Sequence, residues 1–285
     1  MLVTFLWSTS FIIIKWGLLE IPPVTFAGLR YFGAFIFFIP FIFRKKYIIE
    51  IKHLNSYQIK KLILLGLLFY TFTQGAQFLG LYFLPAATVS IILNFTPLAV
   101  AVMGIFLINE KLTFLQWTGS AIFLIGIITY FTPVSLHGNY GLGLFIMLFG
   151  VLANAGSAII GRDINRTGTI SPIVVTFISM GTGAAVLIIT GLIIEGLPKM
   201  SAAALLYLTW LIVVNTAFAF TIWNLTLRSL TAVESSIING TMLIQIALLA
   251  YIFLGEEISF QKGLGMFIAA SGAILVQARR KSFSH

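Results

Sequence analysis

The sequence carries one pattern twice, in two copies displaced by 146 residues. Segment 81–128 aligns without a gap on segment 227–274, and 13 of the 48 aligned positions are identical. The identities with the most weight join scarce or structure-determining residue types: Ser90/Ser236, Glu110/Glu256, Phe114/Phe260, Gly119/Gly265 and Gly126/Gly272. Solenoids have short periods, whereas a period of about half the chain predicts a duplicated half-protein.

The composition points to a membrane protein. The chain has 59% hydrophobic and 9% charged residues, with a mean hydropathy of +1.06. A soluble domain has about a quarter charged residues, so a soluble core of this composition would have almost no surface to cover it. Mostly apolar runs of about 18 or more residues recur along the chain, without the alternation of a β-barrel. We therefore predict an all-α integral membrane protein.

Ten apolar runs are candidate transmembrane helices. They cover roughly residues 2–19, 23–43, 62–83, 88–108, 113–130, 141–160, 171–194, 202–226, 232–254 and 260–278. The duplication divides them into a first repeat over 1–130 (spans 1–5) and a second over 141–281 (spans 6–10).

The basic residues predict the orientation. With the N-terminus inside, 13 Lys and Arg residues fall in the inner loops and tail, and only Lys199 and Lys262 fall outside. This positive-inside bias predicts cytoplasmic N- and C-termini in the cell membrane. Because each half has an odd number of spans, the second half is expected to enter the membrane inverted. Inverted repeats are typical of secondary transporters that work by alternating access.

Several local patterns resemble one transporter family. Trp7-Ser8 with Phe11 and Lys15 lies in the first span, and Pro22-Pro23 followed by Arg30 opens the second. Around the fourth span stand Ala86-Ala87, Pro97, Asn109-Glu110-Lys111-Leu112, Gln116 and Gly119. In their order, these features resemble the EamA family of the drug/metabolite transporter superfamily. The second copy departs from the pattern, with Leu243 at the position of Pro97 and Glu257 at that of Lys111. The resemblance implies a ten-helix transporter of small metabolites, often an exporter.

Ionisable and polar groups inside spans are costly and are therefore candidates for function. Lys15, Arg30, Gln77 and Asn94 are expected to share one layer in the outer part of the first half, with Gln74 nearer the midplane. Ser8 shares a helical face with Lys15. The second half offers Asn154, Asn215 and Asn239. The neutral hydrogen bonds to a substrate are expected from Gln74, Gln77, Asn94, Asn154 and Asn239. Trp7 and Trp223 are the candidate aromatic walls of a substrate cavity.

Each charged candidate also has a purely structural explanation. Lys15 would extend to the outer headgroups or pair with Glu20. Arg30, which is deeper, would need acceptors such as helix carbonyls or Gln77. Glu234, the candidate for proton coupling, would form an interfacial ion pair with Arg228 or stabilise the start of its helix.

Comparison of the two copies favours function for two of these charges. The repeat places Gly161 opposite Lys15 and Ser179 opposite Arg30, so neither charge is duplicated. A charge that the fold required would be expected in both copies. Two cations at one depth predict a substrate with a carboxylate, such as an amino acid.

Other classes of protein lack their signatures. The chain has no Cys, its three His residues (His53, His137 and His285) have no ligand spacing, and no Walker A loop occurs. We expect no metal, no cofactor and no enzymatic activity. The net charge of +9 follows from topology rather than from nucleic-acid binding. The expected partners are a small metabolite, the lipid bilayer and, as a candidate coupling ion, the proton, with a monomer or homodimer as the assembly. A channel, a lipid-linked carrier translocase and a non-transporting sensor or scaffold stay open as alternatives.

Overall fold

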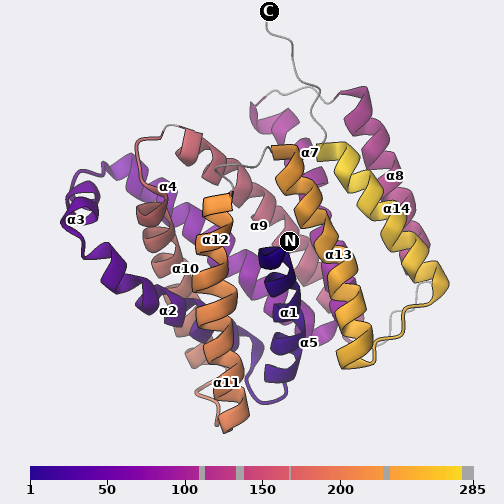
Figure 1. The fold of residues 1–285 in the computed structure, drawn as a ribbon, viewed down its shortest axis with the longest axis horizontal. Helices are drawn as coiled ribbons and strands as arrows, with labels where there is room; N and C mark the ends of the chain where they lie inside the picture. Colours follow the sequence, from indigo (N-terminus) through magenta and orange to yellow (C-terminus); the bar gives the residue numbers. More distant parts are fainter. Residues whose placement is uncertain (109–112, 133–137, 167, 227–231, 278–285) are drawn as a thin grey trace, which may run out of the picture.

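The structure, a computed structural model, describes residues 1–108, 113–132, 138–166, 168–226 and 232–277, and every regular element in these ranges is helical (Figure 1). The first part of the chain forms α1 (Leu2–Gly17), α2 (Pro23–Ile42), α3 (Lys45–Lys52), α4 (Ser56–Gly66), η1 (Leu67–Gln74), α5 (Gly75–Phe83), α6 (Ala86–Leu93), α7 (Thr96–Ile108) and α8 (Phe114–Phe131). The later part forms α9 (Tyr140–Arg166), α10 (Pro172–Ile194), α11 (Ala202–Trp210), η2 (Leu211–Phe218), α12 (Ala219–Thr226), α13 (Ala232–Leu254) and α14 (Phe260–Gln277). The prediction of an all-α protein is confirmed for the described residues.

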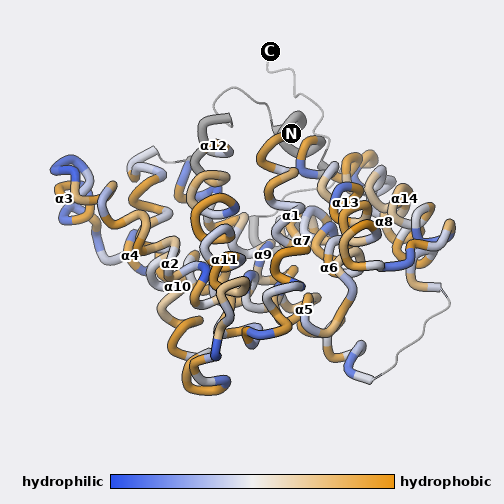
Figure 2. The backbone as a smooth tube through the Cα atoms, turned by 60° about the horizontal axis from the view of Figure 1, so that its bottom comes forward, coloured by the Kyte–Doolittle hydropathy of each residue, from blue (hydrophilic) through white to orange (hydrophobic). Residues whose placement is uncertain are grey.

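Within the described ranges, six helical stretches are long and apolar enough to cross a bilayer: Pro23–Ile42, Ser56–Phe83, Ala86–Gly104, Phe114–Phe131, Tyr140–Asn165 and Pro172–Ile194. Shorter apolar helices cover Leu2–Gly17, Ala202–Phe218, Thr241–Leu254 and Phe260–Val276. Large apolar side chains lie on the surface, such as Phe145 (69% exposed) and Ile193 (77% exposed), and apolar residues dominate the helices in Figure 2. Helices with apolar outer faces are the form that a bilayer requires, so the chain is a multi-pass membrane protein.

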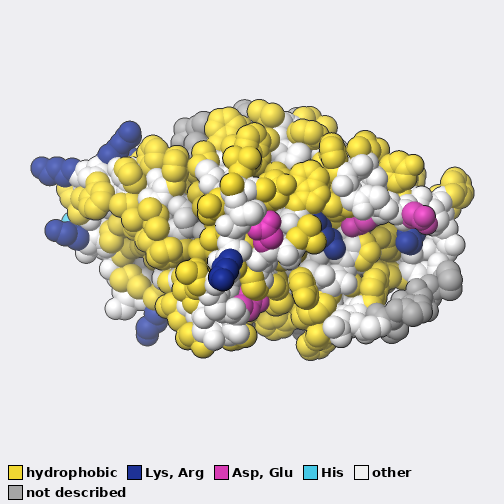
Figure 3. Space-filling model, turned by 90° about the horizontal axis from the view of Figure 1, so that it is seen from below, with side chains coloured by type: hydrophobic (Ala, Val, Ile, Leu, Met, Phe, Trp, Pro, Cys, Tyr) yellow, Lys and Arg dark blue, Asp and Glu magenta, His cyan; other side chains and the backbone are white. Residues whose placement is uncertain are grey.

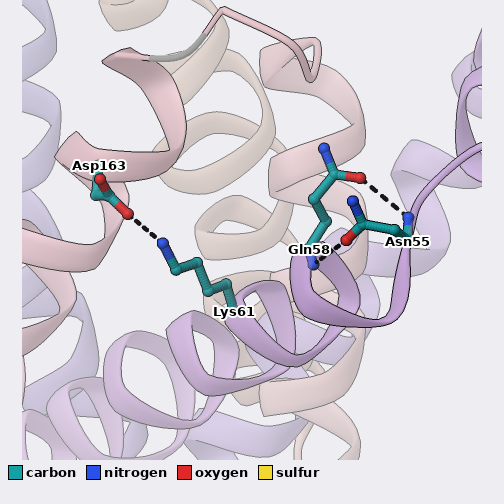
Figure 4. A network of polar contacts seen from close by, with 4 residues as sticks. All are labelled: Asn55, Gln58, Lys61 and Asp163. Atoms are coloured by element: carbon teal, nitrogen blue, oxygen red, sulfur yellow. Dashed lines mark hydrogen bonds and ion pairs between the residues drawn. The ribbon is translucent and has the colours of Figure 1, made fainter.

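One predicted helix start and one predicted loop in the first half differ from the structure. The helix expected from residue 62 begins earlier, at Ser56, because the side chains of Asn55 and Gln58 form a capping box at its start (Figure 4). The loop before it contains a further short helix, α3, that the sequence analysis did not predict.

The continuous span predicted over 88–108 is broken in the structure. A turn at Asn94 and Phe95 separates α6 from α7. The physical reason is Pro97, which has no backbone N–H and whose ring excludes a helical carbonyl four residues earlier. The repeat has Leu243 at the equivalent position, and α13 runs through it without a break.

Helices α8 and α14 lie side by side along one edge of the molecule (Figure 1). They approach so closely that a Cβ atom built on Gly126 would lie 2.3 Å from the backbone N of Ala269, and one on Gly272 would lie 2.3 Å from that of Phe123. The same test brings Gly119 against the backbone of Gly272 and Gly265 against that of Gly126. Small residues permit such contact between membrane helices. The glycines that the repeat aligns thus pack reciprocally in an antiparallel pair.

Two π-helical segments, η1 and η2, interrupt the helical stretches Ser56–Phe83 and Ala202–Thr226. Each contains a threonine whose hydroxyl donates to the carbonyl five residues earlier: Thr73 to Leu68 and Thr216 to Leu211, both at 2.8 Å. Wide turns of this kind are frequent at functional sites. Apolar periodicity did not predict them, because one extra residue in a turn leaves a mostly apolar run apolar.

Candidate functional site

Arg30, on α2, is a buried cation, and no carboxylate in the described part of the chain contacts it. Its side chain is 3% exposed, and Nε donates a 3.0 Å hydrogen bond to Oγ1 of Thr216. The guanidinium carbon lies 5.1 Å from the ring centroid of Tyr31 and 6.0 Å from that of Phe78. The one ion pair among the described residues, with nitrogen and oxygen within 4.0 Å, is that between Lys61 and Asp163. No described carboxylate therefore neutralises Arg30. The expected acceptor, Gln77, is not the partner.

The neighbours of Arg30 form a polar and aromatic layer between α2 and η1. The hydroxyl of Tyr31 donates to Oε1 of Gln74 at 2.7 Å, and the Tyr31 and Tyr70 rings meet at 5.5 Å between centroids. Two predicted site residues, Gln74 and Arg30, are thus connected through Tyr31, which contacts both. Tyr31 is not among the predicted site residues, although the sequence places this tyrosine next to a membrane-embedded arginine.

Trp7 and Trp223, the predicted aromatic walls of a substrate cavity, contact each other. Their ring centroids are 5.3 Å apart, and Phe220 lies 5.2 Å from Trp7. Ser8, the next residue on α1, is fully buried and donates toward the carbonyl of Thr4 and toward Oε1 of Gln245 on α13. The aromatic cluster therefore joins α1 to α12.

Asn215 and Thr216, consecutive residues of η2, connect the two groups of side chains. Thr216 holds Arg30, while the backbone carbonyl of Asn215 accepts from Nε1 of Trp7 at 3.2 Å. The Asn215 amide nitrogen donates to the carbonyl of Leu6, and its Oδ1 atom is buried with no hydrogen-bond partner among the described residues. Because a carbonyl only accepts, this contact fixes the orientation of the amide. A buried acceptor without a donor is rare and costly, and so is a further candidate for function.

The other predicted site residues are more dispersed. Lys15 is half-buried on α1 and lies near enough to Glu256 for their charges to interact, whereas Glu20 binds Ser201 instead of Lys15. Gln77 is half-buried on α5, and Asn239 is exposed on α13. In the described part of the chain, no hydrogen bond or ion pair joins these three side chains to Arg30.

Two of the asparagines make local or interhelical bonds. Asn94, the residue that follows the last residue of α6, donates from its side chain to the Ser90 carbonyl at 2.9 Å. Asn154 on α9 donates to Oγ1 of Thr96 on α7 at 3.1 Å. The side chains of Glu234 and Arg228 lie outside the described residues. In the described part of the chain, no three His, Asp or Glu side chains form a group that fits a metal ion.

Four glutamates bind the N-terminal ends of helices that are distant in sequence, and we call these contacts the carboxylate caps. Glu195 accepts from the N–H groups of Val24 (3.2 Å) and Thr25 (2.7 Å) on α2. Glu256 accepts from those of Ala86 (2.6 Å) and Ala87 (3.1 Å) on α6. Glu20 accepts from the N–H and hydroxyl of Ser201, before α11, and Glu50 accepts from the N–H of Ser171, before α10. A carboxylate there satisfies free N–H groups and interacts favourably with the helix dipole.

The carboxylate caps divide between the two ends of the molecule. Glu195 follows the last residue of α10, and Glu50 binds before its first residue, so these two lie at opposite ends. Acidic side chains lie across the middle of the face in Figure 3, which looks onto the end where α11 begins. The two hydrogen bonds from Ser201 hold the pKa of the Glu20 carboxyl below its usual value. A pocket of about 430 Å³ opens at this end, with Glu20, Pro22, Tyr82 and Glu195 among its lining residues.

Comparison with known proteins agrees with this architecture. The model of the EamA-like transporter family matches residues 1–132 and again 141–278, so the chain belongs to the EamA-like transporter family. It is 28% identical to "Uncharacterized transporter YoaV" of Bacillus subtilis (strain 168), over 96% of this chain and 93% of the relative. It is 25% identical to an "Uncharacterized transporter" of Archaeoglobus fulgidus, over 98% and 96% of the two chains. One solved crystal structure superposes with a TM-score of 0.65 at 15% identity, covering 96% of each chain, which is a likeness of fold. The protein is thus a membrane transporter by family.

Proposed function

We propose that the protein is a secondary transporter that moves small carboxylate-bearing metabolites, such as amino acids, across the cell membrane by alternating access. Export is the direction that the family resemblance implies. The proposal includes ten spans in two inverted five-helix repeats, over 1–130 and 141–281, with both termini in the cytoplasm. The observation that carries the choice of substrate is the buried Arg30, whose charge no described carboxylate neutralises.

An anionic substrate would complete the Arg30 site. A cation in a low-dielectric interior is costly unless an anion and hydrogen bonds compensate it. The bond to Thr216 uses Nε, which leaves the terminal nitrogens of the guanidinium for a bidentate contact with a carboxylate. Gln74, Gln77, Asn154 and Asn239 are the proposed neutral polar contacts, Ser8 and Asn94 orient their helices, and Lys15 supplies a second positive charge near the surface. Trp7 and Trp223 would pack against the apolar part of the substrate.

Two reciprocal contacts support the inverted arrangement. In the α2–α10 pair, Glu195 at the end of α10 caps α2, while Glu50 after α2 caps α10. In the α8–α14 pair, Gly119 faces Gly272 and Gly126 faces Gly265. Two units related by a twofold axis make reciprocal contacts. If a feature of the first unit contacts a second feature of its partner, the same contact recurs with the two units exchanged.

Alternating access assigns a role to the carboxylate caps. Glu20, Glu195 and Glu256 each join the segment 1–132 to the segment 141–278. If the two segments rock about a central site, these contacts must break when that end opens. Proton coupling is part of the proposal, with Glu234 as the candidate whose side chain lies outside the described residues.

Transport by the reconstituted protein tests the proposal. Purified protein is first screened against amino acids, other carboxylates, amines and nucleosides by thermal shift, because a ligand of the native state raises its apparent stability. Stabilising compounds are then used as radiolabelled substrates in proteoliposome counterflow. Saturable counterflow of a carboxylate that Arg30→Gln abolishes and Lys199→Gln leaves intact is the expected result. Flux that does not saturate would identify a channel, and transport of a lipid-linked compound would identify a carrier translocase. Ligand binding without flux would identify a sensor. Each of these results would overturn the proposal.

A further inference from the structure

The helix α3 lies between the end of α2 and the start of α4, at the far left of Figure 1, and presents two different faces. One face packs into the molecule: Tyr47, Ile51 and the following Leu54 contact a buried apolar cluster that includes Leu62 and Val174. The carboxylate of Glu50 accepts from the N–H of Ser171, which fixes the helix to the start of α10. The orientation of α3 is therefore set by the fold.

The opposite face of α3 is basic and exposed. Arg44, Lys45, Lys46 and Lys52 are all exposed, and none of them forms an ion pair within the described residues. Figure 3 shows Lys and Arg side chains projecting at the left edge, where α3 lies. Lys61 is different, because Asp163 neutralises it (Figure 4). Four exposed cations without an ion pair among the described residues thus lie on and beside α3.

Exposed apolar groups flank these charges. Phe43 before α3 is 68% exposed, Ile49 within it is 45% exposed and Tyr57 after it is 64% exposed. A helix with a basic surface beside exposed apolar side chains is typical of a segment that lies in the membrane interface. Because α2 and the stretch Ser56–Phe83 are both long and apolar enough to cross the bilayer, we expect the helix that connects them at the level of the headgroups.

We infer that the α3 surface, formed by Arg44, Lys45, Lys46 and Lys52 with Phe43 and Ile49, binds the headgroups of anionic phospholipids. Four exposed cations at the headgroup level complement a leaflet that carries phosphate and excess negative charge. The flanking apolar side chains favour a lipid over a soluble anion, since they have a place in the acyl boundary. This inference does not depend on the transported substrate.

Native mass spectrometry of the full-length protein in detergent tests the inference. The protein is titrated with phosphatidylglycerol and with phosphatidylcholine of the same acyl chains. We expect the wild type to bind phosphatidylglycerol in preference to phosphatidylcholine. The changes Lys45→Gln, Lys46→Gln and Lys52→Gln, made singly and combined in a triple Gln variant, should weaken phosphatidylglycerol binding about fivefold for each lysine removed. The triple replacement of the same lysines by Arg keeps the charge and should keep the preference. Lys199→Gln combined with Lys262→Gln removes two charges outside α3 and should change nothing.

Three results would overturn the inference: equal binding of the two lipids, a preference unchanged in the triple Gln variant, or an equal loss in the Lys199/Lys262 control. Displacement of phosphatidylglycerol by equimolar inorganic phosphate would also overturn it, because the surface would then recognise phosphate rather than a lipid. Melting temperatures identify any variant that does not fold, and the single change Lys52→Gln then replaces the triple variant.

Discussion

The carboxylate of Glu195 accepts a 2.7 Å hydrogen bond from the backbone N–H of Thr25, and so ties the end of α10 to the start of α2. The chain separates these two residues by 170 positions. Glu50 repeats the relationship at the opposite end of the same helix pair through Ser171. The α2–α10 pair, which carries Arg30, is therefore held at both ends by a carboxylate on a helix N-terminus.

Replacing Arg30 should separate function from stability. We expect Arg30→Met to weaken substrate binding about tenfold to a hundredfold, since it removes a charge-assisted hydrogen-bonded contact. Its melting temperature should be equal to or above that of the wild type, because an uncompensated buried charge is removed. Binding isotherms and thermal unfolding check the two parts. A strongly lowered melting temperature with intact transport would assign Arg30 a structural role only.

Thr216 should act through Arg30. Thr216→Val keeps the shape but leaves Nε of Arg30 without its 3.0 Å acceptor. We expect substrate affinity to fall about tenfold, in keeping with the net value of a hydrogen bond to a charged group. Thr216→Ser restores the hydroxyl and should restore affinity. If the Val and Ser variants behave alike, the hydroxyl does not position the guanidinium.

The caps formed by Glu195 and Glu256 should bias the conformational equilibrium. Glu195→Gln and Glu256→Gln each weaken a helix cap by about 1 kcal/mol, which favours the state that is open at that end. The chain has no native cysteine, so a single Gln77→Cys reports access without background. Its reaction with a membrane-impermeant maleimide should be faster in both variants. The matched change Glu257→Gln, at an exposed position next to a cap, should leave the rate unchanged; equal rates in all variants would contradict a gating role.

The pH dependence of the Glu20 cap has a definite sign. Because Ser201 lowers the pKa of Glu20 in the folded protein, the stabilisation is present above the unfolded pKa of about 4.3 and is lost as the pH falls through the lower folded value. Melting temperatures of the wild type and of Glu20→Gln should therefore differ at pH 7 and converge below about pH 4. A constant difference across this range would show that the carboxylate is not responsible.

The contact between α8 and α14 should tolerate no added methyl group. A Cβ on Gly126 would lie 2.3 Å from a backbone nitrogen, so we expect Gly126→Ala to destabilise the protein by about 1–3 kcal/mol. Gly141→Ala is the control, because nothing lies within 4 Å of the Cβ it would add. Thermal unfolding in detergent compares the two. Equal stability of the variants would mean that the helices are not in this close contact.

The sequence by itself determined the helices and the family. Long apolar runs can satisfy their backbone groups in lipid only as helices, and prolines and capping residues set their ends, so most predicted spans match described helices. The ordered motifs led to the EamA family, which the match over residues 1–132 and 141–278 confirmed. Pro97, the residue that breaks the helix between α6 and α7, is also visible in the sequence, although periodicity alone predicted a continuous span.

The tertiary structure alone decided which polar groups meet. The partner of Arg30 is Thr216, at a separation of 186 positions, and the partner of Trp7 is the Asn215 carbonyl, at a separation of 208. Such pairs depend on the rotation and depth of the packed helices. The extra residue in the π-helical turn of η2 changes the rotation of the residues that follow it, and no local sequence pattern encodes that rotation. Depth counted along a single helix predicted Lys15 and Arg30 in one layer. Packing places Lys15 near enough to Glu256 for their charges to interact, and it brings Arg30 into contact with Thr216 on η2.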